Sequence, residues 1–82
     1  MSVSESVRLA LTKGRVKQKQ LALRLGFTSQ AVHLKLVKER WTGAELAKVA
    51  ELTGGKLVFL YPDGDMIQIR VPEDRPAEGE EV

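Results

Sequence analysis

Four neighbouring side chains near the middle of the sequence could contact nucleic-acid bases: Ser29, Gln30, His33 and Leu34. A glutamine amide can donate to N7 of adenine and accept from its N6 amino group, and serine or histidine can meet several acceptor edges. Leucine can touch the methyl group of thymine, although Leu34 could instead pack beneath the loop that holds Trp41. His33 could equally be a solvent-facing helical residue without a role. We expect Gln30 to be the main base-reading residue.

The sequence around these residues is strongly basic. Nine lysines and arginines lie from Arg8 to Arg40, against one acidic residue, Glu39. Such a surface attracts polyanions, and its affinity falls as salt rises because each neutralised phosphate releases counterions. The basic residues that flank the base-reading set are expected to contact phosphate: Lys17, Lys19, Lys35, Lys38 and Arg40. A solvated charged surface with no partner is the alternative.

Charge is divided unevenly along the chain. Residues 1–71 carry twelve Lys and Arg against six Asp and Glu, whereas residues 72–82 carry one Arg against five acids, which gives +6 and −4. The acidic end has no apolar periodicity, so we expect a disordered tail after a single domain of residues 1–71. Such a tail could compete with DNA for the basic surface, or serve only to keep the protein in solution.

Several kinds of site are not indicated. With no cysteine and one histidine, neither a disulfide framework nor a metal site is expected, and no cofactor is implied. The sequence contains no Ser-His-Asp order, paired carboxylates or phosphate-binding loop, so we expect a protein that is not an enzyme. The first residues do not resemble a signal peptide and no apolar run approaches the length of a membrane span, which predicts a cytoplasmic protein.

Capping residues predict the ends of two scaffold helices. Ser2 and Glu5 form a capping box, and apolar residues at helical spacing follow until Gly14, which is expected to stop the first helix. Thr42 and Glu45 form a second capping box, which starts the fourth helix; the glycine pair at positions 54 and 55 ends it.

Between these helices the sequence predicts two shorter ones, over residues 18–25 and 29–37. Gly26 suits the left-handed conformation of a tight turn, and Thr28 is a good N-cap for the helix that follows. The residues expected in the core are Leu21, Ala22, Leu25, Phe27, Val32 and Leu36.

The two segments share one motif, which runs Gln18-x-x-Leu21-Ala22-x-x-Leu25-Gly26-Phe27-Thr28-x-x-x-Val32. This motif, with the capped helix after it, resembles the helix-turn-helix of the phage Cro/repressor (XRE-like) family over about residues 6–54. The resemblance implies a DNA-binding fold in which Gln18 contacts phosphate and Ser29, Gln30 and His33 read bases. We also expect Thr28 to contact phosphate. The chain departs from the family after residue 54, where a fifth helix is usual.

In place of that helix the sequence predicts a β-hairpin, with strands over residues 56–61 and 66–71 around a turn at 62–65. A lone hairpin is marginal in water, and the first strand is apolar on both faces, so a covering surface is expected. We predict a dimer interface formed by Leu57, Phe59, Tyr61, Ile67 and Ile69. The alternative is a hairpin that folds back on the first and fourth helices of its own chain.

The sequence therefore predicts a mainly α fold with a small β part: a four-helix helix-turn-helix domain, a C-terminal hairpin and a disordered acidic tail. The expected function is a homodimeric, sequence-specific transcription regulator that binds double-stranded DNA at an inverted repeat. Repression of the phage or mobile-element type is expected, because 82 residues leave no room for a ligand domain. Two alternatives are open: an antitoxin or antiactivator that holds a protein partner through the hairpin or tail, and a DNA-bending excision accessory protein.

Overall fold

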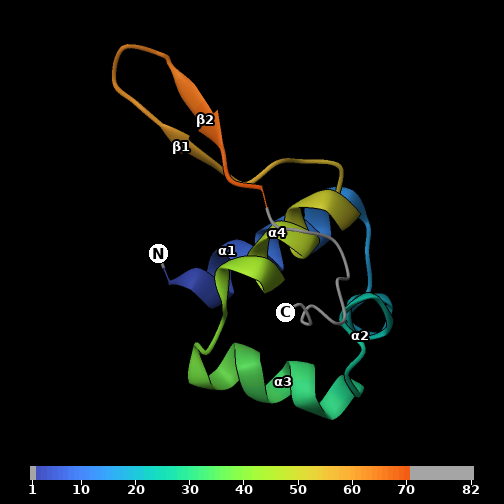
Figure 1. The fold of residues 1–82 in the computed structure, drawn as a ribbon. Helices are drawn as coiled ribbons and strands as arrows, with labels where there is room; N and C mark the ends of the chain where they lie inside the picture. Colours follow the sequence, from blue (N-terminus) through green and yellow to red (C-terminus); the bar gives the residue numbers. More distant parts are fainter. Residues whose placement is uncertain (1, 71–82) are drawn as a thin grey trace, which may run out of the picture.

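A computed structural model describes residues 2–70, which form four helices followed by a two-stranded antiparallel hairpin (Figure 1). The mainly helical fold with a C-terminal hairpin is confirmed. The predicted acidic tail, residues 72–82, lies outside the described residues. The elements are α1 Val3–Gly14, α2 Gln18–Leu25, α3 Ser29–Lys38, α4 Gly43–Leu52, β1 Val58–Leu60 and β2 Met66–Gln68.

The core is a small aliphatic cluster to which every helix contributes. Leu21 of α2 and Val32 of α3 are fully buried at its centre. Burial of each such side chain stabilises the fold by about 1.5–3 kcal/mol. The other buried apolar residues are Val7, Leu11, Ala22, Leu36 and Val49. The predicted apolar spacing in α2 and α3 is therefore confirmed at Leu21, Ala22, Val32 and Leu36, while Leu25 packs at the edge of the cluster.

Both predicted capping boxes are present. The Ser2 hydroxyl accepts from the Glu5 amide at 3.0 Å, and the Glu5 carboxylate accepts from the Ser2 amide at 2.8 Å. Thr42 and Glu45 make the same reciprocal pair at 3.1 and 2.9 Å. These bonds satisfy backbone amides that the first turn of a helix leaves without partners, so the starts of α1 and α4 are fixed locally.

α1 ends at Gly14 as predicted, although Gly14 does not itself take the left-handed conformation. Gly14 is the last residue of the helix, and it is Arg15, with φ of 56°, that takes the left-handed conformation. Gly14 is instead a point of close approach, because a Cβ atom there would lie 2.8 Å from Cα and Cβ of Thr53, just after α4. The glycine lets α1 and the end of α4 touch.

Replacing Gly14 with alanine is expected to lower the free energy of unfolding by about 1–3 kcal/mol, because the added methyl group overlaps Thr53. Gly43→Ala is the matched control: no atom lies within 4 Å of a Cβ at Gly43, and alanine favours the helix. Chemical denaturation of both variants checks the prediction. Equal stability of the two would show that the helices separate without cost.

Phe27 does not enter the core as predicted. Its side chain is 37% exposed, and the Lys35 ammonium lies 5.2 Å from the centre of its ring. Phe27 is also not among the partly buried residues that pack against the core cluster. A cation over an aromatic face is a modest attraction at an exposed site.

The hairpin is shorter than predicted, with three residues in each strand, and it projects away from the helices (Figure 1). Cα partners are Val58 with Gln68, Phe59 with Ile67, and Leu60 with Met66. None of its residues is among those packed on the core cluster. The alternative in which the hairpin folds back on α1 and α4 is therefore wrong.

Candidate nucleic-acid interface

The turn between α2 and α3 is built as the sequence predicts. Gly26 has φ of 77°, its amide donates to the Leu23 carbonyl at 3.2 Å, and the Phe27 amide donates to the Ala22 carbonyl at 2.9 Å. In Figure 1 α2 is seen nearly end-on and α3 lengthwise, so the two helices cross at a steep angle. Their inner faces meet in the core through Leu21 and Val32, which leaves one side of α3 turned outward.

That outward side carries the predicted base-reading residues. Ser29, Gln30 and His33 are exposed, and Leu34 is 49% exposed, so Leu34 does not pack beneath the Trp41 loop. Val37, 58% exposed, extends the same surface, which we call the α3 outer face. Sequence reasoning missed Val37, although its place seven residues after Gln30 puts it on one helix face with His33 and Leu34.

The two helices of this unit begin without an acidic residue in their first turns, whereas α1 and α4 begin with Glu5 and Glu45. Lys17 is the N-cap residue of α2, where its amide donates to the Gln20 side chain at 2.8 Å, and Lys19 is exposed in the first turn of the same helix. Cations at the positive end of a helix disfavour the helix itself. A bound anion such as phosphate would relieve this repulsion.

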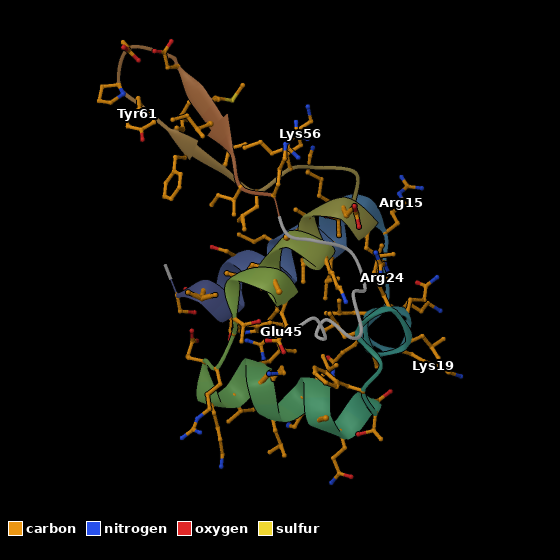
Figure 2. All side chains as sticks on the ribbon, viewed as in Figure 1. Arg15, Lys19, Arg24, Glu45, Lys56 and Tyr61 are labelled. Carbon is orange, nitrogen blue, oxygen red and sulfur yellow. The ribbon has the colours of Figure 1, made fainter. Side chains whose placement is uncertain are left out.

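The remaining predicted phosphate contacts fall into two groups. Lys38 and Arg40 are exposed at the far end of α3, and Gln18 is half-buried at the start of α2. The Thr28 hydroxyl accepts from the Ala31 amide at 3.0 Å as the N-cap of α3, and its proton can still be donated outward. Figure 2 shows Lys19 pointing away from the body of the molecule, outside α2.

Lys35 is placed differently from the other predicted phosphate contacts. Its ammonium lies 3.0 Å from the Glu45 carboxylate and 3.2 Å from the Arg40 carbonyl, in addition to its position over Phe27. Glu45 stands between α4 and α3 (Figure 2). The side chains of Lys35 and Glu45 are 21% and 14% exposed, so this partly buried pair braces α3 against α4. We therefore leave Lys35 out of the interface.

Glu39, the one acid of the basic segment, is directed to the start of α1. Its carboxylate accepts from the Ser4 amide at 3.2 Å, and this hydrogen bond lowers the pKa of Glu39 below its ordinary value. The negative charge of Glu39 thus stabilises the N-terminal end of α1, where the helix dipole is positive. Glu39 itself adopts a left-handed conformation, with φ of 58°, where α3 ends.

A buried serine that the sequence did not single out holds α3 in place. Ser4 is 1% exposed; its hydroxyl donates to the Leu36 carbonyl at 2.6 Å and accepts from the Trp41 indole N–H at 3.2 Å. One side chain of α1 thus joins α3 to the loop before α4. The only sequence signal was a serine one turn before Val7 on the apolar face of α1.

Ser4→Ala is expected to lower the free energy of unfolding by about 1–3 kcal/mol, because both the Leu36 carbonyl and the Trp41 indole lose a partner. Trp41→Phe removes only the indole bond. In a double-mutant cycle measured by urea unfolding, the two changes should cost less together than the sum of the single changes. Strict additivity would mean that the Trp41–Ser4 bond contributes nothing.

Residues 2–70 contain no group of three or more His, Cys, Asp or Glu side chains placed to hold a metal ion. No helix within the same residues is long and apolar enough to cross a membrane. Comparisons with known protein families, curated proteins and solved structures find no match for the chain. A function therefore follows from its own surface chemistry.

Proposed function

We propose that the protein binds double-stranded DNA in a sequence-specific way and regulates transcription. The observation that carries the proposal is the α3 outer face, a row of exposed side chains on a helix held across α2 by a buried core. The major groove of DNA is about 12 Å wide and admits one α-helix. α3 presents hydrogen-bonding and methyl-contacting groups together on one exposed side.

The α3 outer face fits base pairs of adenine and thymine. Gln30, in the first turn of the helix, pairs with the N7 and N6 positions of adenine. Leu34 and Val37 lie further along the same face and are the aliphatic contacts for thymine methyl groups. Ser29 and His33 supply further polar contacts. The preferred half-site should accordingly contain A·T pairs.

Phosphate contacts come from both ends of the reading helix. Lys17, Gln18, Lys19 and Thr28 lie around the starts of α2 and α3, and Lys38 and Arg40 lie at the end of α3. DNA strands flank the major groove on both sides, so cations at both ends position the helix in the groove without reading sequence. Bound in this way, the protein would exclude others from the same site. Repression by occupancy, in the cytoplasm, is the corresponding mode of regulation.

Selection of bound sites from random double-stranded DNA tests the proposal. We expect one enriched motif with A·T pairs, bound about 1,000-fold or more tightly than random DNA, with affinity that falls steeply with salt. Equal binding to all sequences, together with bending in a circular-permutation assay, would indicate an architectural protein instead. Failure to bind DNA at low salt would indicate a protein-interaction module.

A further inference from the structure

The hairpin presents apolar side chains on both of its faces. The register places Phe59 opposite Ile67, and an additional bond of 2.8 Å from the Ile69 amide to the Leu57 carbonyl continues the ladder toward the helices. Alternation along the strands puts the five residues of the predicted dimer interface on one face, which we call the Phe59 face. The other face carries Val58, Leu60, Met66 and Gln68.

Most of this surface is uncovered. Phe59 is 58% exposed and Ile67 is 55% exposed, while Leu60 and Met66 on the other face are exposed by 69% and 65%. A two-stranded hairpin standing alone is marginally stable in water, and apolar side chains exposed on a projecting ribbon call for a partner surface. The acidic end of the chain is poorly suited to cover the Phe59 face, because residues 72–82 offer few apolar side chains. Apart from prolines these are Ala77 and Val82.

The charges of the hairpin favour a second copy of itself as the partner. Lys56 and Arg70 flank the base, and Asp63 and Asp65 form the tip, with no charged residue from 57 to 62 or from 66 to 69. Two hairpins laid antiparallel bring the basic base of each beside the acidic tip of the other. Two hairpins laid in the same direction would bring like charges together, at a cost.

The composition of the two hairpin faces favours the Phe59 face as the dimer interface. The Phe59 face is apolar from Leu57 to Tyr61 and from Ile67 to Ile69, whereas Gln68 lies on the other face. A two-fold interface uses the same patch on both subunits, which an apolar patch with opposite charges at its two ends satisfies. Neither strand of the hairpin contains a charged residue or a proline that would interrupt this patch.

We propose that the protein forms a two-fold homodimer in which the Phe59 faces of two hairpins pack together antiparallel, the base of each beside the tip of the other. This interface is independent of the proposed DNA binding. α3 and the hairpin lie at opposite ends of the molecule (Figure 1), so dimerisation leaves both α3 outer faces uncovered. Each copy then contributes one reading helix, and a two-fold pair of reading helices recognises an inverted repeat.

The first test compares the same substitution on adjacent residues of opposite faces. Phe59→Asp places a charge inside the interface and should weaken dimerisation at least about a hundredfold in sedimentation over a range of concentrations. Leu60→Asp, on the face away from the partner, should leave the dimer largely intact. Circular dichroism should show helices α1 to α4 folded in both variants. A monomeric wild type, or equal loss in both variants, would overturn the proposal.

Charge reversal tests the antiparallel arrangement without touching the apolar face. A base variant combines Lys56→Glu with Arg70→Glu, and a tip variant combines Asp65→Lys with Asp63→Asn. The asparagine keeps the acceptor that Asp63 offers to the Asp65 amide at 2.9 Å in the turn. Each variant alone should dimerise at least about tenfold more weakly than wild type, because base and tip then carry like charges.

An equimolar mixture of the base and tip variants should regain the dimer, since each base again faces a tip of opposite sign. All four substitutions in one chain should also restore the homodimer, which a same-direction arrangement would not do. Light scattering at matched concentrations measures both. If the combined chain does not recover, the antiparallel arrangement is wrong, even where the mixture dimerises, because the two variants laid in the same direction also bring opposite charges together. Sedimentation reports this whether or not the protein binds DNA.

Discussion

Removing the two lysines at the start of α2 should weaken DNA binding about ten- to a hundredfold, whatever the DNA sequence. The double variant Lys17→Ala with Lys19→Ala should also flatten the dependence of log affinity on log salt by about two for each bound copy of the protein, since each lost phosphate contact accounts for about 0.9 of that slope. Lys17 caps α2 and Lys19 lies in its first turn, where their charges oppose the helix dipole. The free protein should therefore become no less stable.

The matched control removes the same charge from a helix outside the proposed interface. Arg8 and Lys13 are exposed on α1, and changing both to alanine lowers the net charge equally. This control should change affinity only slightly and leave the salt slope nearly unchanged, which filter binding from low to moderate salt measures. If both double variants lose the same affinity, binding depends on net charge alone and α2 has no special place in it.

Local features of the fold could be predicted from the sequence because they depend on neighbouring residues. The capping boxes at Ser2 and Thr42 need only a partner three residues on, and Gly26 needs only a left-handed backbone. Apolar spacing likewise assigned Leu21 and Val32 to the core. The exposed positions of Ser29, Gln30, His33 and Leu34 followed as the complement of that core.

The features that the sequence did not reveal are contacts between elements distant in sequence. α1 ends at Gly14 as predicted, but the lack of a side chain at Gly14 also permits the close approach of Thr53, which no local pattern reveals. Lys35 was grouped with the phosphate contacts, and its actual partner, Glu45, becomes a neighbour only when α4 packs beside α3. Ser4 is buried because two hydrogen bonds, one from the side chain of Trp41, accommodate its hydroxyl.

The hairpin shows the same division between local and distant information. The alternation of residues along each strand is enough to assign the Phe59 face, and the observed register agrees with that assignment. That the hairpin stands apart from the helices could not be predicted, because its position depends on the path of the chain after α4. No hairpin residue is among those packed on the core cluster. That separation is what leaves the Phe59 face available to a second copy.

Gln30→Ala should remove the preference for one base pair of the recognition site. The expected loss is about 1–3 kcal/mol at that position, or about 5- to 150-fold in affinity, because a paired amide is lost from the groove. Affinity for random DNA should stay nearly constant, since phosphate contacts supply it. α3 should stay folded, as its N-cap is Thr28 and alanine favours a helix.

Gln68→Ala is the matched control, because it removes an exposed glutamine from the hairpin at the opposite end of the molecule and off the Phe59 face. Affinity should be measured for the selected site and for variants substituted at each base pair. In the Gln30→Ala protein, changing one A·T pair of the DNA should no longer lower the affinity, whereas changes at the other base pairs should still lower it. In the Gln68→Ala protein, the loss of affinity at every base pair should match wild type. Should Gln30→Ala instead weaken selected and random DNA by the same factor, Gln30 contacts the backbone, and the readers of sequence are to be sought at His33, Leu34 and Val37.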